Sequence, residues 1–133
     1  MAEKPVPAPS EETAPYWEGA RRRELVLPRC TGCGWYVAQP RLVCPKCQGE
    51  TFDWHPVSGT GKIHTCTIVH QAAAPGFDVP YVVVRVSLDE QPECLITTNL
   101  VGAYDVERLD IGLPVVVEFE ERGGISLPQF RLE

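Results

Sequence analysis

Four cysteines arranged as two C-x-x-C pairs constrain the fold of this chain more than any other feature. The pairs are Cys30–Cys33 and Cys44–Cys47, and ten residues separate them. Each C-x-x-C turn brings two sulfurs within reach of one ion, and two such turns supply a tetrahedral four-sulfur shell. Because four protein ligands leave no open coordination position, the spacing predicts one structural Zn²⁺ per chain, closing a zinc ribbon over residues 27–52.

Other uses of cysteine fit this pattern less well. A thioredoxin-like redox pair needs one C-x-x-C in a βαβ setting, which the sequence does not offer. A rubredoxin-like iron site uses similar turns, usually much farther apart. The remaining cysteines, Cys66 and Cys94, lie in apolar, strand-like segments and are interpreted as buried small hydrophobes, which argues against a secreted disulfide scaffold.

The residues around the ribbon predict a mainly β protein. Composition favours a disordered or extended tail over 1–12, and the pattern favours a helix over 13–26. Residues 53–133 alternate apolar and polar positions in five strand-like stretches, which suits a five-stranded OB-fold barrel. The first stretch reads as one long strand, bent at Gly59-Thr60-Gly61, and residues 102–112 predict a turn or a single helical turn.

The helix places aromatic residues next to basic ones. Tyr16 and Trp17 share a face, and Arg21 follows toward the end where cations suit the helix dipole. A short amphipathic helix cannot bury two aromatic rings by itself. They either pack on this chain's own ribbon or barrel, or they dock into another subunit, since aromatic and arginine side chains are favoured interface anchors.

No catalytic constellation is recognisable. His55 and His64 read as packing or surface residues, and His70 ends a predicted strand before a long loop. No serine, cysteine or carboxylate stands at a spacing that makes a nucleophile–base pair, and phosphate-loop and dinucleotide motifs are missing. We therefore expect no catalytic residues and no autonomous enzyme.

Charge and hydropathy restrict the classes of partner that we expect for this chain. Net charge is −6, made up of +1 over residues 1–50 and −7 over residues 51–133. An acidic barrel repels phosphate backbones, so nucleic acid is not an expected partner, although both zinc ribbons and OB-folds serve in nucleic-acid binding and that function stays the alternative. No apolar run is long enough to span a membrane and no signal peptide is visible, so we expect a cytoplasmic protein.

Several short motifs occur together in one order. They are P-Y-W-E-G at 15–19, the cysteine pairs, V-S-G-T-G at 57–61, T-I-V-H at 67–70, P-Y-V-V at 80–83, T-N-L-V-G at 98–102 and I-G-L-P-V at 111–115. In this order they resemble the family of zinc-ribbon OB-fold proteins that accompany thiolases, lipid-transfer-type aldolases and other acyl-CoA enzymes. The resemblance covers nearly the whole chain beyond residue 14.

The resemblance implies a non-catalytic subunit bound to a thiolase-fold partner, in a hetero-tetramer that an enoyl-CoA hydratase joins in some assemblies. Family members are thought to support the partner and to shelter an acyl-CoA thioester. Loop position and chemistry then suggest Lys62, His70 and Phe77 as residues near that thioester. On the helix, Tyr16, Trp17 and Arg21 are the residues expected to bind the partner. The freestanding alternative, an electron carrier, requires iron.

Overall fold

A computed structural model describes residues 4–133, so the first three residues of the predicted tail lie outside the described part. Helix α1 spans Ala14–Arg21 and strand β1 spans Leu25–Cys30. The helix is therefore shorter than the range 13–26 that the sequence predicts, and strand β1 was not predicted. Two residues after the helix ends, Arg23 adopts a left-handed backbone conformation with a φ of 63°. The chain changes direction at this residue and enters β1.

The ribbon contains a two-stranded antiparallel sheet. Strand β1 pairs with β2 (Phe52–Val57), with Leu25 opposite Val57 and Cys30 opposite Phe52. Strand β2 was predicted as the start of the barrel's first strand, and that assignment is wrong because β2 and β3 belong to different sheets. Gly59, at φ 79°, makes the connection between them and lies buried against the Val117 side chain.

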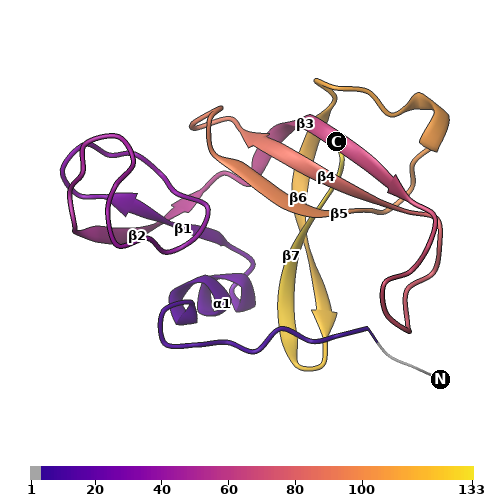
Figure 1. Ribbon diagram of the computed structural model, residues 1–133, viewed down its shortest axis with the longest axis horizontal. Coiled ribbons are helices and arrows are strands. Elements are labelled where there is room, and N and C mark those ends of the chain that lie inside the picture. Colours follow the sequence, from indigo (N-terminus) through magenta and orange to yellow (C-terminus); the bar gives the residue numbers. More distant parts are fainter. Residues whose placement is uncertain (1–3) are drawn as a thin grey trace.

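The second sheet is a closed barrel of five strands, as predicted (Figure 1). Its strands are β3 (Thr60–Val69), β4 (Tyr81–Leu88), β5 (Leu95–Val101), β6 (Pro114–Arg122) and β7 (Ile125–Leu132), in the order β3-β4-β5-β7-β6. Strands β5 and β7 run parallel, and the other neighbours run antiparallel. The single turn of 3-10 helix at Val106–Arg108 confirms the helical turn expected between 102 and 112.

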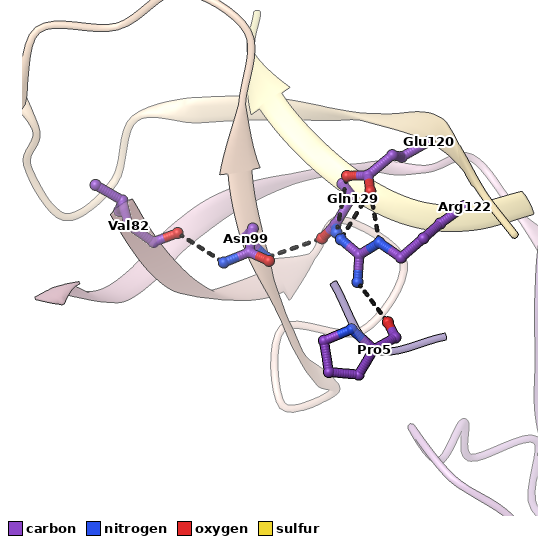
Figure 2. A network of polar contacts seen from close by, with 6 residues as sticks. All are labelled: Pro5, Val82, Asn99, Glu120, Arg122 and Gln129. Carbon is purple, nitrogen blue, oxygen red and sulfur yellow. Dashed lines mark hydrogen bonds and ion pairs between the residues drawn. The ribbon is translucent and has the colours of Figure 1, made fainter. Parts of the chain in front are cut away.

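Barrel closure depends partly on side chains. Backbone pairing between β5 and β7 involves Leu100 with Phe130 and Val101 with Arg131. Gln129, which is almost fully buried, continues this contact because its Oε1 accepts the Asn99 backbone N–H at 2.9 Å. Figure 2 shows Asn99 reaching on to the Val82 carbonyl of β4. A side-chain amide therefore extends the seam where the backbone pairing is short.

Ribbon and barrel share one hydrophobic core. Leu25 and Leu27 of β1 belong to the same buried cluster as the barrel residues Ile63, Val86 and Phe130. Cys94 is buried in this cluster, as the sequence predicts. Cys66 packs against the cluster but is only half-buried. Within residues 4–133, no helix is long and apolar enough to cross a membrane.

Candidate metal centre and partner-binding surface

The two C-x-x-C turns bring all four sulfurs together. The Sγ atoms of Cys30, Cys33, Cys44 and Cys47 lie within 4.8 Å of one another. Across the two turns, Cys30 Sγ lies 3.5 Å from Cys47 Sγ, and Cys33 Sγ lies 3.6 Å from Cys44 Sγ. A Zn–S bond of about 2.3 Å in a tetrahedral shell requires sulfurs about 3.8 Å apart. The sulfurs therefore fit one tetrahedral ion, and the predicted four-cysteine metal site is confirmed.

Backbone N–H groups point at these sulfurs. Lys46 N–H donates to Cys44 Sγ and Gly49 N–H donates to Cys47 Sγ, each at 3.4 Å. Burial raises the pKa of Cys44, but the N–H groups of Cys47 and Lys46 outweigh it and bring that pKa down to about 6. The N–H of Cys33 likewise lowers the pKa of Cys30. Thiolates are the form that binds metal, so the loops favour the ligand state of these two residues.

Small residues leave room for the sulfurs to converge. A Cβ atom added at Gly49 would lie 3.3 Å from Cys47 Sγ, tighter than ordinary van der Waals contact, and would touch Cys30 Sγ at 3.5 Å. Cys30 and Cys44 are buried, whereas Cys33 and Cys47 are exposed, so one side of the site borders the protein and the other borders solvent. Lys46 lies on the solvent side with its ammonium 4.4 Å from the centre of the Trp35 ring.

Helix α1 divides the residues that the sequence assigned to a partner. Tyr16 packs against the core cluster, and burial raises the pKa of its hydroxyl to about 12. Trp17 instead lines a surface groove of about 170 Å³ together with the exposed Arg21. The opposite wall of the groove is the start of β7, from Gly124 to Ser126. Of the three residues that the sequence assigned to a partner, Trp17 and Arg21 therefore line this groove and Tyr16 does not.

A polar clamp, which the sequence did not reveal, fixes α1 against the barrel. Arg23 donates to Glu121 Oε1 at 2.6 Å and to Ser126 Oγ at 3.2 Å, and its guanidinium lies 5.8 Å from the centre of the Phe119 ring. Hydrogen bonds from Ser126 and Arg23 lower the pKa of Glu121. Arg23, two residues beyond the end of α1, thus holds the helix to the β6–β7 hairpin.

A second contact missed by the sequence joins the ribbon to the barrel. Gln91, in the turn between β4 and β5, accepts from the Tyr36 N–H and donates to the Tyr36 carbonyl, both at 2.8 Å. The neighbouring Glu90 accepts from Ser58, and Asp89 accepts from the Thr60 hydroxyl at 2.6 Å. This turn therefore sets the orientation of the ribbon, and no periodicity marks it in the sequence.

The three residues suggested near a thioester are not brought together. Lys62 is exposed near the start of β3, where it pairs with Pro114 of β6. His70 is exposed just beyond the other end of β3, and Phe77 is half-buried in the following loop with its ring 5.4 Å from Tyr81. Eight residues of extended strand span on the order of 20 Å or more. Lys62 therefore belongs to a different end of the barrel from His70 and Phe77.

The other histidines occupy distinct settings. His64 is exposed on β3. His55 is half-buried on β2 and lines an open hollow of about 400 Å³ beside the metal site, with Arg29 and Asp53. The hollow adjoins Cys30 and Cys33, which the four-sulfur cluster already uses.

Comparison with known proteins adds an independent line of evidence. Residues 17–53 match the family described as "ChsH2, rubredoxin-like zinc ribbon domain", and residues 54–120 match "ChsH2, C-terminal OB-fold domain". A solved chain described as "Ltp2-ChsH2(DUF35) aldolase" superposes with a TM-score of 0.82 and 34% identity, over 96% of this chain and 98% of that one.

Curated relatives differ in length. A "DUF35 domain-containing scaffold protein" of Methanocaldococcus jannaschii is 36% identical, over 77% of this chain and 73% of the relative. A "Probable enoyl-CoA hydratase alpha subunit" of Thermomonospora curvata is 37% identical over 96% of this chain, which spans 40% of that longer relative. Family models match both the ribbon and the barrel, and a solved relative superposes on the chain over nearly its full length. This chain therefore belongs to the ChsH2 (DUF35) family of zinc-ribbon and OB-fold proteins.

Proposed function

We propose that this chain is a non-catalytic scaffold subunit of an acyl-CoA enzyme complex. The observation that carries the proposal is its likeness, over nearly its full length, to a chain described as part of an aldolase. A relative named as a scaffold protein supports the same role. The partner that best suits the family is a thiolase-fold enzyme, either a thiolase or a steroid side-chain retro-aldolase, in a cytoplasmic hetero-tetramer that an enoyl-CoA hydratase can join.

The groove between α1 and the β6–β7 hairpin is the proposed docking surface. Trp17 offers an indole ring that is half-buried, with its N–H donating to Thr13 Oγ1 at 3.2 Å. Its polar atom is therefore satisfied within the chain, and the ring face is available for apolar contact. Arg21 beside it offers a charge to an acidic residue of the partner. Aromatic and arginine side chains of this kind often dominate binding energy at an interface.

The metal and the loop after β3 have separate proposed roles. Cys30, Cys33, Cys44 and Cys47 hold one structural Zn²⁺, which fixes the ribbon and supplies no reaction chemistry because its shell is closed. His70 and Phe77 lie on the loop side of the barrel, and we assign the acyl-CoA thioester to that side. Lys62 lies at the other end of the barrel, so it could contact the acyl-CoA only at a point away from His70 and Phe77.

Capture from the native cell tests the proposal. Tagged protein should recover a thiolase-fold enzyme as its major partner. Recovery of nucleic acid, a ribosome or a polymerase instead would favour the alternative function, a zinc-ribbon and OB-fold module for nucleic acid.

A substitution in the groove tests the docking surface. Trp17→Ala should weaken association with the captured partner by about 2 kcal/mol or more, measured by calorimetry, because a buried aromatic anchor is lost. Metal content should not change. Trp35→Ala is the matched control, since Trp35 is also half-buried but lies on the ribbon. Equal affinities for the wild type and Trp17→Ala would remove the groove from the interface.

A further inference from the structure

Three consecutive residues near the N-terminus contact two separate parts of the barrel. The Pro5 carbonyl accepts from Arg122 Nη1 at 3.3 Å. Val6 lies over the hairpin turn, where a Cβ added at Gly123 would come within 2.7 Å of its Cγ2 atom. The Lys4 ammonium lies 5.6 Å from the centre of the Phe77 ring, in the loop between β3 and β4. Composition predicts a disordered or extended tail here, and these contacts show residues 4–6 bridging the hairpin and the loop.

The receiving side of this contact is rigid. Arg122 is largely buried, and its Nε and Nη2 atoms lie 2.8 and 2.7 Å from Glu120 Oε2. Gln129 contacts the other oxygen of Glu120 and also holds Asn99 of β5 (Figure 2). Because Nε and Nη2 face Glu120, the remaining Nη1 points at the Pro5 carbonyl outside the sheet. Arg122 therefore presents a fixed donor to an extended backbone.

The loop on the other side has few anchors of its own. Residues 70–80 contain no helix or strand, and most of them are exposed. Phe77 is half-buried, and its ring packs against Tyr81 at the start of β4. Because Lys4 covers this ring, the N-terminal segment adds a contact at the point where the loop meets the barrel.

We propose that the surface formed by Arg122, Gly123 and Phe77 is a docking site for the chain's own residues 4–6, which act as a strap that holds the β3–β4 loop in place. The strap joins the hairpin to the loop without any backbone pairing between them. The consequence for thioester binding rests on the proposed function, which assigns the acyl-CoA to the same loop; the strap itself does not depend on it.

Hydrogen exchange on the isolated full-length chain tests the strap. The double variant Lys4→Glu/Val6→Asp places a negative charge against the aromatic ring and removes the apolar contact over Gly123. We expect amide exchange in residues 71–79 to rise about threefold to tenfold, with exchange in β6 and metal content unchanged. Ala8→Asp is the control, since it adds a charge to the same segment at an exposed position.

Two results would overturn the strap. One is unchanged loop exchange in the double variant, and the other is an equal rise in Ala8→Asp, which would indicate a general charge effect. The measurement needs no partner, so it separates the two proposals. If the chain captures a thiolase-fold enzyme but the double variant shows no change in loop exchange, only the strap is refuted. If loop exchange rises in the double variant but no thiolase-fold enzyme is captured, only the scaffold role is refuted.

Discussion

The ribbon and the barrel reach stable structure by different means. Between residues 31 and 51, Val37 and Cys44 are the only apolar residues that are fully buried, and Leu42 is 89% exposed. The barrel buries a continuous cluster of valine, leucine, isoleucine and phenylalanine side chains from all five strands. The ribbon loops therefore lack the apolar surface to fold by burial and depend on a metal ion, whereas the barrel follows the usual hydrophobic route.

The two regions nevertheless behave as one frame because their seam is shared. Leu25 and Leu27 of the ribbon sheet complete the barrel's core, and Gln91 of the barrel holds Tyr36 of the ribbon. The metal therefore organises only the ribbon loops, while the orientation of the ribbon is set by apolar contact and one side-chain amide.

The largest expected effect comes from the metal. Cys30→Ser should release the ion and disorder residues 31–51, because apparent free energies of structural zinc binding are about 10–16 kcal/mol. Barrel amide signals should persist in two-dimensional NMR spectra, with shifts near the seam, while elemental analysis reports the metal. Cys66→Ser is the control cysteine, outside the site. A metal-free variant with ordered ribbon loops would contradict the contrast between the regions.

Truncation of the barrel core gives the reverse test. Phe130 is fully buried, and Phe130→Ala should lower the free energy of unfolding by about 3–5 kcal/mol, measured in urea. The metal content of the folded fraction should stay at one ion per chain, since the sulfurs do not contact this side chain. A folded fraction of Phe130→Ala that holds clearly less than one ion per chain would show that the metal site depends on the barrel core.

The seam itself is tested by Gln91. Gln91→Ala should lower the free energy of unfolding by about 2 kcal/mol, because the part-buried N–H and C=O of Tyr36 lose their partner. Gln91→Glu should cost a similar amount, since a carboxylate accepts from the N–H but cannot donate to the carbonyl. Unfolding in urea measures the cost, and residual dipolar couplings report the angle between ribbon and barrel. If both variants keep wild-type stability and angle, apolar contact alone sets the orientation.

The smallest effect concerns pH and the clamp on α1. Hydrogen bonds from Ser126 and Arg23 lower the pKa of Glu121 in the folded chain, so the carboxylate form stabilises the fold at neutral pH. That contribution is lost as pH falls from the ordinary glutamate pKa through the lowered one. The difference in melting temperature between wild type and Glu121→Gln should therefore shrink between about pH 6 and pH 3. A constant difference would mean that the exposed ion pair adds nothing measurable.

Local chemistry explains which features were predictable from the sequence. The metal site depends on two short turns, so the spacing of Cys30, Cys33, Cys44 and Cys47 was enough to predict one ion. The barrel strands beyond residue 80 follow from alternation, since a valine-rich run such as 81–88 has few other ways to bury its side chains. The motif order also pointed to the correct family before any geometry was known.

Tertiary structure decided what depends on partners distant in the chain. Strand β2 was predicted to begin the barrel, but it pairs with β1 in a separate sheet. Arg23 finds its partner in Glu121, 98 residues further along the chain. Lys62 lies near the start of β3, whereas His70 lies just beyond its other end. Periodicity records which face a residue prefers, whereas the neighbour that it meets there is fixed only when the whole chain closes.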